Sequence, residues 1–209
     1  MDPISLKFFL YIIIVLSAVF HEYAHAWSAY RLGDTTAKDA GRLTLNPFVH
    51  LDLMGTVLIP LFLLFTSGIF IGWAKPVPYN PFNLKDQKYG SLKVGVAGPS
   101  ANILIALILG LFSRFFSGYF AVAGFISPIF QEFLGLIIYI NIFLALFNLI
   151  PMPPLDGSKI FMDLFPRQWR YFEQFGFLGI FIALFLAFFF LPPVAQVIFK
   201  LITGGEFSF

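Results

Sequence analysis

The chain has 209 residues, of which 59% are hydrophobic and only 11% are charged, and its formal net charge is +2. Soluble domains usually carry about 25% charged residues, so this composition excludes an ordinary water-soluble globular protein. No long basic run indicates nucleic-acid binding, and the lack of cysteine excludes disulfide bonds and thiol catalysis.

Apolar residues fall in long runs rather than in the periodic patterns of amphipathic helices or strands. These runs lie at 4–20, 53–72, 101–113, 133–151 and 175–199. The longer ones approach the ~20 residues that a helix needs to cross a bilayer. The sequence therefore predicts an all-α polytopic membrane protein, a single domain over residues 1–209. We expect about five transmembrane helices, a re-entrant segment and short β-strand or loop elements at the active-site face.

The expected elements follow from these runs and from the positions of glycine and proline. A first helix covers about 4–30, and a polar loop follows at 31–50. The apolar segment 51–72 is interrupted by Gly55, Pro60 and Gly68, and the proline-rich stretch 73–91 favours an extended loop or edge strand. Further elements are a helix at about 92–114, a helix at about 129–150, a loop or short helix at 155–170, and a last helix at about 172–191 that stops at Pro192-Pro193.

The most informative motif is His21-Glu22-Tyr23-Ala24-His25, which falls in the first predicted helix. Residues four apart lie on the same helical face, so both imidazoles can bind one metal ion. Zinc makes a water molecule acidic enough to release a proton near neutral pH, and the neighbouring Glu22 can accept that proton. Ionisable side chains are costly at bilayer depth, which favours this role over a polar patch that only satisfies helix contacts.

A catalytic zinc ion usually has three protein ligands, so a third residue is needed. The chain has only three histidines, and the remaining one, His50, lies in a loop. Asp156, in the segment Asn148-Leu-Ile-Pro-Met-Pro-Pro-Leu-Asp156-Gly157, directly follows a hydrophobic helix and is the best candidate. A simple turn is the alternative, because Asp-Gly is a common turn dipeptide.

Three motifs, in this order, resemble the signatures of the site-2 proteases, the intramembrane zinc metalloproteases of peptidase family M50. They are the His-Glu-x-x-His motif, Gly98-Pro99-Ser-Ala-Asn102 and Asn148…Pro-Leu-Asp156-Gly157. Two further segments, Asn46-Pro47-Phe-Val-His50-Leu-Asp52 and Trp73-Ala-Lys-Pro76-Val-Pro78, resemble the compact bacterial and archaeal branch. The sequence shows neither the PDZ-like insert nor the CBS pair of other members, which leaves substrate selection unassigned.

The resemblance implies that His21, His25 and Asp156 bind one zinc ion and that Glu22 is the general base. It implies a catalytic core at about 4–165 and an accessory C-terminal helix at about 172–191. The activity implied is a zinc endopeptidase that cleaves membrane-protein substrates in or next to their transmembrane segments. The implied partners are this substrate and the lipid bilayer, and no nucleic acid.

Two asparagines admit both a catalytic and a structural interpretation. Near the zinc ion, the amide of Asn148 could stabilise a developing oxyanion or position an extended substrate. Asparagines in membrane helices also commonly form hydrogen bonds to neighbouring helices, and the same choice applies to Asn102. We interpret His50 and Asp52 as loop-forming or capping residues.

The proposed ligands also restrict the topology. One zinc ion can bind all three only if the end of the first helix and the end of the 129–150 helix lie on the same side of the membrane. Segment 51–72 should then enter the membrane and return. A single crossing is the alternative, because the segment is long enough to span, but it would divide the Lys and Arg residues less unequally between the two sides. In the re-entrant arrangement the other side holds only Lys7, Arg114 and Lys200 of the 13 Lys and Arg residues, which places the active site towards the cytoplasm of a bacterial or archaeal cell membrane.

Two other classes of protein could use a membrane metal site. A transporter would explain histidine and aspartate residues within the membrane, but it would leave Glu22 without a functional role. A membrane protease of the type that trims prenylated proteins usually completes its site with a glutamate, yet Glu132 and Glu173 lie in no comparable motif.

Overall fold

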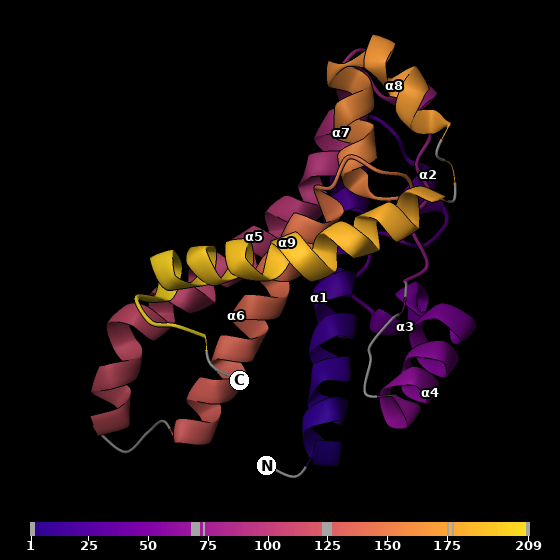
Figure 1. Ribbon diagram of the computed structural model, residues 1–209. Helices are drawn as coiled ribbons and strands as arrows, with labels where there is room; N and C mark the ends of the chain where they lie inside the picture. Colours follow the sequence, from indigo (N-terminus) through magenta and orange to yellow (C-terminus); the bar gives the residue numbers. More distant parts are fainter. Residues whose placement is uncertain are drawn as a thin grey trace. The chain divides into compact units, whose positions relative to one another are not determined.

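The computed structural model describes residues 3–67, 72, 74–122, 127–174, 176 and 178–207. Within these ranges every regular element is a helix (Figure 1), which confirms the all-α prediction. The polar loop 31–50 contains two short helices, α2 (Thr36–Asp39) and α3 (Pro47–His50), and residues 74–80 form no regular element. Gly68 and Trp73, singled out above, lie outside the described residues.

Four helices in the described ranges are long and apolar enough to cross a membrane. They are α1 (Pro3–Arg31), α5 (Gly90–Val122), α6 (Pro128–Asn148) and α9 (Leu178–Thr203). Lipid offers no hydrogen bonds to the backbone, so a continuous helix is the stable conformation of such segments. The prediction of a polytopic membrane protein is confirmed, with four such helices described where about five were expected.

The C-terminal helix differs from the prediction. The sequence predicts a helix at about 172–191 that stops at Pro192-Pro193, but α9 begins at Leu178 and contains both prolines. A separate helix, α8 (Pro166–Glu173), precedes it. Proline ends a helix readily where water can bond the freed carbonyl groups. In an apolar segment a complete break would leave more backbone groups unpaired, so the helix continues through the pair.

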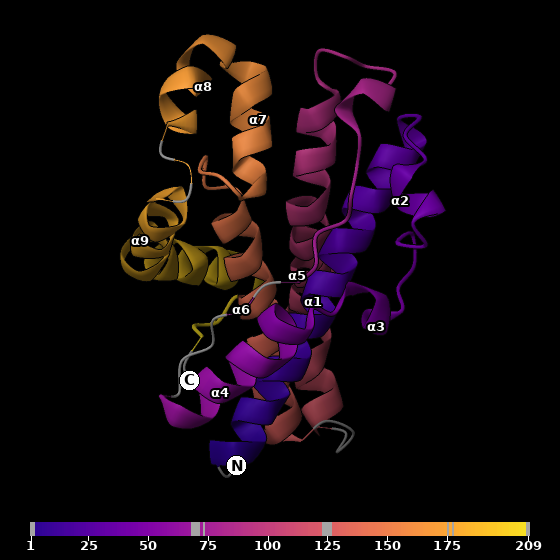
Figure 2. The same ribbon diagram turned by 90° about the vertical axis from the view of Figure 1, so that its right-hand side faces the viewer.

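The chain forms two compact units, Met1–Gly98 and Pro99–Phe209, and the division falls within α5. In the first unit, α1 contacts both α2 and α3. The helix α4 (Ile59–Thr66) lies beside the N-terminal half of α1 (Figure 2), where the Lys7 ammonium group donates a hydrogen bond of 3.1 Å to the carbonyl oxygen of Leu64.

The described part of the apolar segment, residues 51–67 and 72, has features expected of a re-entrant path. A π-helical turn, η1 (Leu53–Leu58), continues directly into α4, and together they are shorter than the ~20 residues needed to cross a bilayer. The backbone N–H of Lys75 donates to the carbonyl oxygen of His50 over 3.1 Å. The two ends of the segment therefore meet, which supports entry and return from one side.

In the second unit, α9 packs across α6 (Figure 1). Their core consists of Ala106, Leu134, Ile138, Ile142, Ala195, Phe199 and Ile202. Within this unit the buried side chain of Asn102 on α5 donates a 2.8 Å hydrogen bond to that of Asn141 on α6. The helices α7 (Asp156–Leu164) and α8 contact each other side by side (Figure 2).

A fully buried carboxylate, Asp34, organises the loops of the first unit outside the membrane-spanning helices. It accepts hydrogen bonds from the backbone N–H and hydroxyl of Thr36, the backbone N–H of Asn80 and the side-chain amide of Asn83, which ends the short helix η2 (Pro81–Asn83). Burial by itself raises the pKa of the Asp34 carboxyl, but these hydrogen bonds together outweigh burial and hold the pKa below its usual value. The ionised form therefore stabilises the folded loops.

We expect Asp34→Asn to lower the stability of the protein by about 2 kcal/mol, or roughly 4–8 °C in apparent melting temperature near pH 7. Because the folded-state pKa is depressed, the stabilisation by Asp34 is present above the ordinary aspartate pKa and is lost as the pH falls below about 4. Thermal unfolding in detergent near pH 7 and near pH 4 would measure both effects. The exposed Asp39→Asn is the control, and an equal loss in both variants would contradict the prediction.

Candidate metal centre

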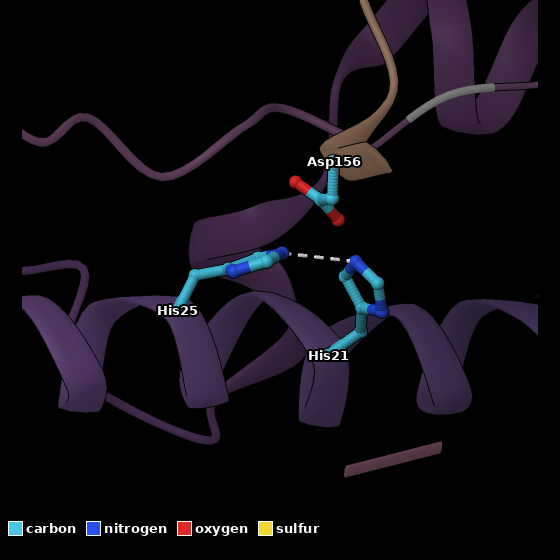
Figure 3. A group of neighbouring side chains, drawn as sticks. All are labelled: His21, His25 and Asp156. Carbon is cyan, nitrogen blue, oxygen red and sulfur yellow. Dashed lines mark hydrogen bonds between the residues drawn. The ribbon is translucent and has the colours of Figure 1, made fainter. Parts of the chain in front are cut away.

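The helix α1 presents His21 and His25 on one face (Figure 3). Both side chains are 6% exposed, and their Nε2 atoms lie 3.0 Å apart. The Nδ1 atom of His25 lies 2.6 Å from the carbonyl oxygen of Val94. A carbonyl oxygen only accepts hydrogen bonds, so neutral His25 carries its proton on Nδ1 and presents the Nε2 lone pair towards His21. A carbonyl group behind an imidazole commonly orients it in this way for metal binding.

Gly98 keeps the space in front of these nitrogen atoms open. The residue is buried in α5, and a Cβ atom at this position would overlap the Nε2 atoms of both His21 and His25. A larger residue would fill the space in front of both nitrogen atoms, where an ion held by the pair would bind. The glycine of the Gly98-Pro99 motif thus leaves room for such an ion.

Glu22 follows His21 and is half-buried. Its carboxylate does not point freely into solvent, because Oε2 accepts a 2.8 Å hydrogen bond from the backbone N–H of Val77. The irregular segment 74–80 thus reaches the predicted general base. Sequence reasoning did not identify this contact.

Asp156 is the first residue of α7 and is 6% exposed. Its Oδ1 atom pairs with the ammonium group of Lys159, one helical turn later, at 2.8 Å. A Cβ atom at Gly157 would overlap the carbonyl oxygens of Leu149 and Ile150. The Asp156-Gly157 pair therefore opens a helix that starts close to the end of α6, and it does not form the simple turn considered above.

His21, His25 and Asp156 each offer one side-chain atom that could hold a metal ion (Figure 3). All three side chains are buried. Two imidazole nitrogens and one carboxylate oxygen are a donor set that zinc accepts in catalytic sites. The chemistry of these donors, the orientation of His25 by Val94 and the open space at Gly98 all fit a zinc ion.

The other residues singled out in the sequence have identifiable contacts. The side-chain amide of Asn148, the last residue of α6, donates to the carbonyl oxygen of Leu144 in its own helix at 3.0 Å. Asp52 caps η1 by accepting a hydrogen bond from the backbone N–H of Gly55, which confirms the capping interpretation. The His50 ring lies 2.8 Å from the carbonyl oxygen of Thr44 within the loop. Asn102 pairs with Asn141, as described above.

Comparison with known proteins identifies relatives that are named as zinc metalloproteases. Residues 9–191 match the family model described as peptidase family M50. YwhC from Bacillus subtilis (strain 168), named as a candidate zinc metalloprotease, is 38% identical over 99% of this chain and 91% of its own length. Rip2 from Mycolicibacterium smegmatis, named in the same way, is 33% identical over 78% of this chain and 61% of its own length. The zinc metalloprotease MJ0392 from Methanocaldococcus jannaschii is 24% identical over 79% of this chain and 37% of its own length. No solved structure matches the chain significantly.

We expect Gly98→Ala to reduce bound zinc to less than about a tenth of the wild-type amount, because the added methyl group occupies the space in front of both Nε2 atoms. Elemental analysis of the purified protein would measure the zinc content. Gly205→Ala is the matched control, since a Cβ atom there meets no heavy atom within 4 Å. Full zinc binding by Gly98→Ala would show that the space is not needed.

Proposed function

The chain belongs to peptidase family M50 and is a zinc metalloprotease, and we propose that it hydrolyses peptide bonds in or next to the transmembrane segments of membrane-protein substrates. The family and the four long apolar helices make the chain an integral membrane protein of bacteria.

The observation that carries the proposal is the position of the histidine pair. His21 and His25 lie within a helical stretch, Leu6–Arg31, that is long and apolar enough to cross a membrane. Both imidazoles are buried, and one carries a carbonyl partner from α5. Metal-binding residues in a membrane-spanning helix suit a substrate that is itself embedded in the membrane, because such a substrate can approach the site through the lipid.

The proposed roles follow from the chemistry of each side chain. His21, His25 and Asp156 would hold the zinc ion, and Lys159 would orient the Asp156 carboxylate through its ion pair. When bound, zinc supplies Lewis acidity, which acidifies water and polarises the carbonyl group under attack. Glu22 would accept the proton of the attacking water and deliver it to the leaving amine.

Asn148 is proposed to position the substrate or the developing oxyanion. Its side-chain amide has two N–H groups, and one of them is used by the carbonyl oxygen of Leu144. The second N–H can donate to a substrate carbonyl group at the end of α6. The hydrogen bond to Leu144 would then fix the amide in a defined orientation.

The membrane setting adds two requirements to this mechanism. Hydrolysis consumes water, so a polar path must lead to the site below the membrane surface. A substrate helix also uses its carbonyl groups in its own hydrogen bonds, so the helix must unwind locally before the bond is cleaved. Substrates with helix-breaking residues near the cleaved bond would meet this requirement at lower cost.

We expect Glu22→Gln to bind zinc as the wild type does but to cleave a model single-span substrate at least about 100-fold more slowly, because glutamine cannot accept the proton. Asp156→Ala should lose most of its zinc as well as its activity. Parallel zinc analysis and cleavage assays on the two purified variants would separate catalysis from metal binding.

Glu22→Gln is a conservative change at this position, since the amide oxygen of glutamine can still accept the hydrogen bond from Val77. Normal cleavage by this variant would exclude Glu22 as the general base. The protein would then be a protease in which another group accepts the proton.

We propose that the active site faces the cytoplasm, as the distribution of Lys and Arg indicates. The chain has no cysteine, so single cysteines at Ala40 and Lys88, both exposed, are selective reporters. Both should react with a membrane-impermeant maleimide in inverted vesicles and not in intact cells. Labelling of the two positions from opposite sides would contradict the re-entrant path of segment 51–72.

A further inference from the structure

Glu22 accepts a hydrogen bond from an irregular segment whose residues take no part in the proposed mechanism. We call residues 75–80, Lys75-Pro76-Val77-Pro78-Tyr79-Asn80, the strap. The strap forms no helix or strand, and Val77 at its centre donates the 2.8 Å hydrogen bond to Glu22 Oε2. We propose that the backbone N–H of Val77 is the positioning group of the general base and that the strap exists to hold it in place.

The two prolines of the strap make this N–H selective. Pro76 and Pro78 have no backbone N–H, so Val77 supplies the single backbone donor in residues 76–78. The Glu22 carboxylate therefore has no neighbouring strap amide with which to exchange its hydrogen bond. Proline also restricts the backbone on both sides of Val77, which reduces the conformational freedom lost when the contact forms.

Both ends of the strap are fixed by buried residues. At one end the guanidinium group of Arg42 donates to the carbonyl oxygen of Lys75, and the N–H of Lys75 donates to the carbonyl oxygen of His50. At the other end the N–H of Asn80 donates to Asp34 at 2.7 Å. Arg42, His50 and Asp34 are 6%, 1% and 0% exposed.

These anchors explain residues that the proposed mechanism does not use. The guanidinium group of Arg42 and the carboxylate of Asp34 are costly to bury. Each forms a hydrogen bond with the backbone of the strap. Val77 lies between the two anchored ends and is thereby held at a fixed position in front of α1. The loop motifs that contain Asp34, Arg42 and His50 thus act on Glu22 through Val77.

The strap also limits how a substrate can bind there. The backbone N–H groups of Lys75, Val77 and Asn80 are already bonded within this unit. A substrate strand that paired with the strap would therefore have to donate its own N–H groups to carbonyl oxygens of the strap. The proline-rich stretch is thus better suited to position Glu22 than to offer a complete edge strand.

Hydrogen exchange tests the contact without relying on catalysis. In Glu22→Ala the Val77 amide should exchange at least about tenfold faster than in Glu22→Gln, whose side chain still accepts the bond. A fragment that covers 76–78 reports on Val77 alone, because the two prolines carry no amide hydrogen. The Asn80 amide, bonded to Asp34, is the internal control and should not change.

Proline substitution tests the catalytic consequence, which rests on the proposed role of Glu22. Val77→Pro removes the donor and should lower kcat by about 10- to 100-fold, with zinc content and KM within about twofold of wild type. Ala74→Pro is the matched control: it lies just outside the strap and its N–H donates no hydrogen bond among the described residues. Its kcat should equal that of the wild type.

Equal Val77 exchange in Glu22→Ala and Glu22→Gln would overturn the proposal, and so would a simultaneous rise at Asn80, which indicates general loosening. Wild-type kcat in Val77→Pro would overturn it as well. If Val77→Pro does not fold, the exchange comparison decides. Failure of the proposed function would appear elsewhere, as no cleavage of the single-span substrate by the zinc-loaded wild type, and would leave the exchange result unaffected.

Discussion

Below the membrane surface a polar group must find its hydrogen-bond partner within the protein, because lipid offers none. This constraint accounts for the most specific contacts within each unit. The imidazole of His25 meets the carbonyl oxygen of Val94, and the amide of Asn102 meets that of Asn141. Each contact joins helices or segments that are far apart in sequence. The few polar residues of an apolar chain therefore determine how its helices pack, in addition to any chemistry they perform.

The sequence is sufficient to propose His21 and His25 as metal ligands because their signal is local. The spacing of His21 and His25 requires only a helix, and an apolar run predicts that helix. A ligand role for Asp156 was harder to predict, since an Asp-Gly pair is also common in turns. The structure distinguishes the two readings through Gly157, whose missing side chain lets α7 start against the carbonyl groups of Leu149 and Ile150. That close approach is a tertiary property, which no single-residue propensity contains.

The groups that orient the site could not be predicted, and the reason is physical. The carbonyl group of Val94 and the N–H of Val77 belong to the backbone, which every residue carries, so residue type gives no signal for them. The partner of Asn102 depends on how α5 and α6 are rotated within the second unit. The course of α9 through Pro192 and Pro193 depends on an apolar environment that outweighs the helix-breaking tendency of proline.

A backbone amide is well suited to hold a general base. A lysine or arginine at the same place would also bind the carboxylate of Glu22, but its full positive charge would favour the ionised form and weaken the base. An acidic donor could exchange its own proton with Glu22. The N–H of Val77 instead carries no net charge and does not titrate in the range where enzymes work, so it fixes the carboxylate without a full charge or an acidic proton beside it. The charged residues Arg42 and Asp34 instead contact the strap two and three residues away from Val77, at Lys75 and Asn80. The fold can therefore use buried charges to fix the position of Glu22 while keeping those charges out of direct contact with its carboxylate.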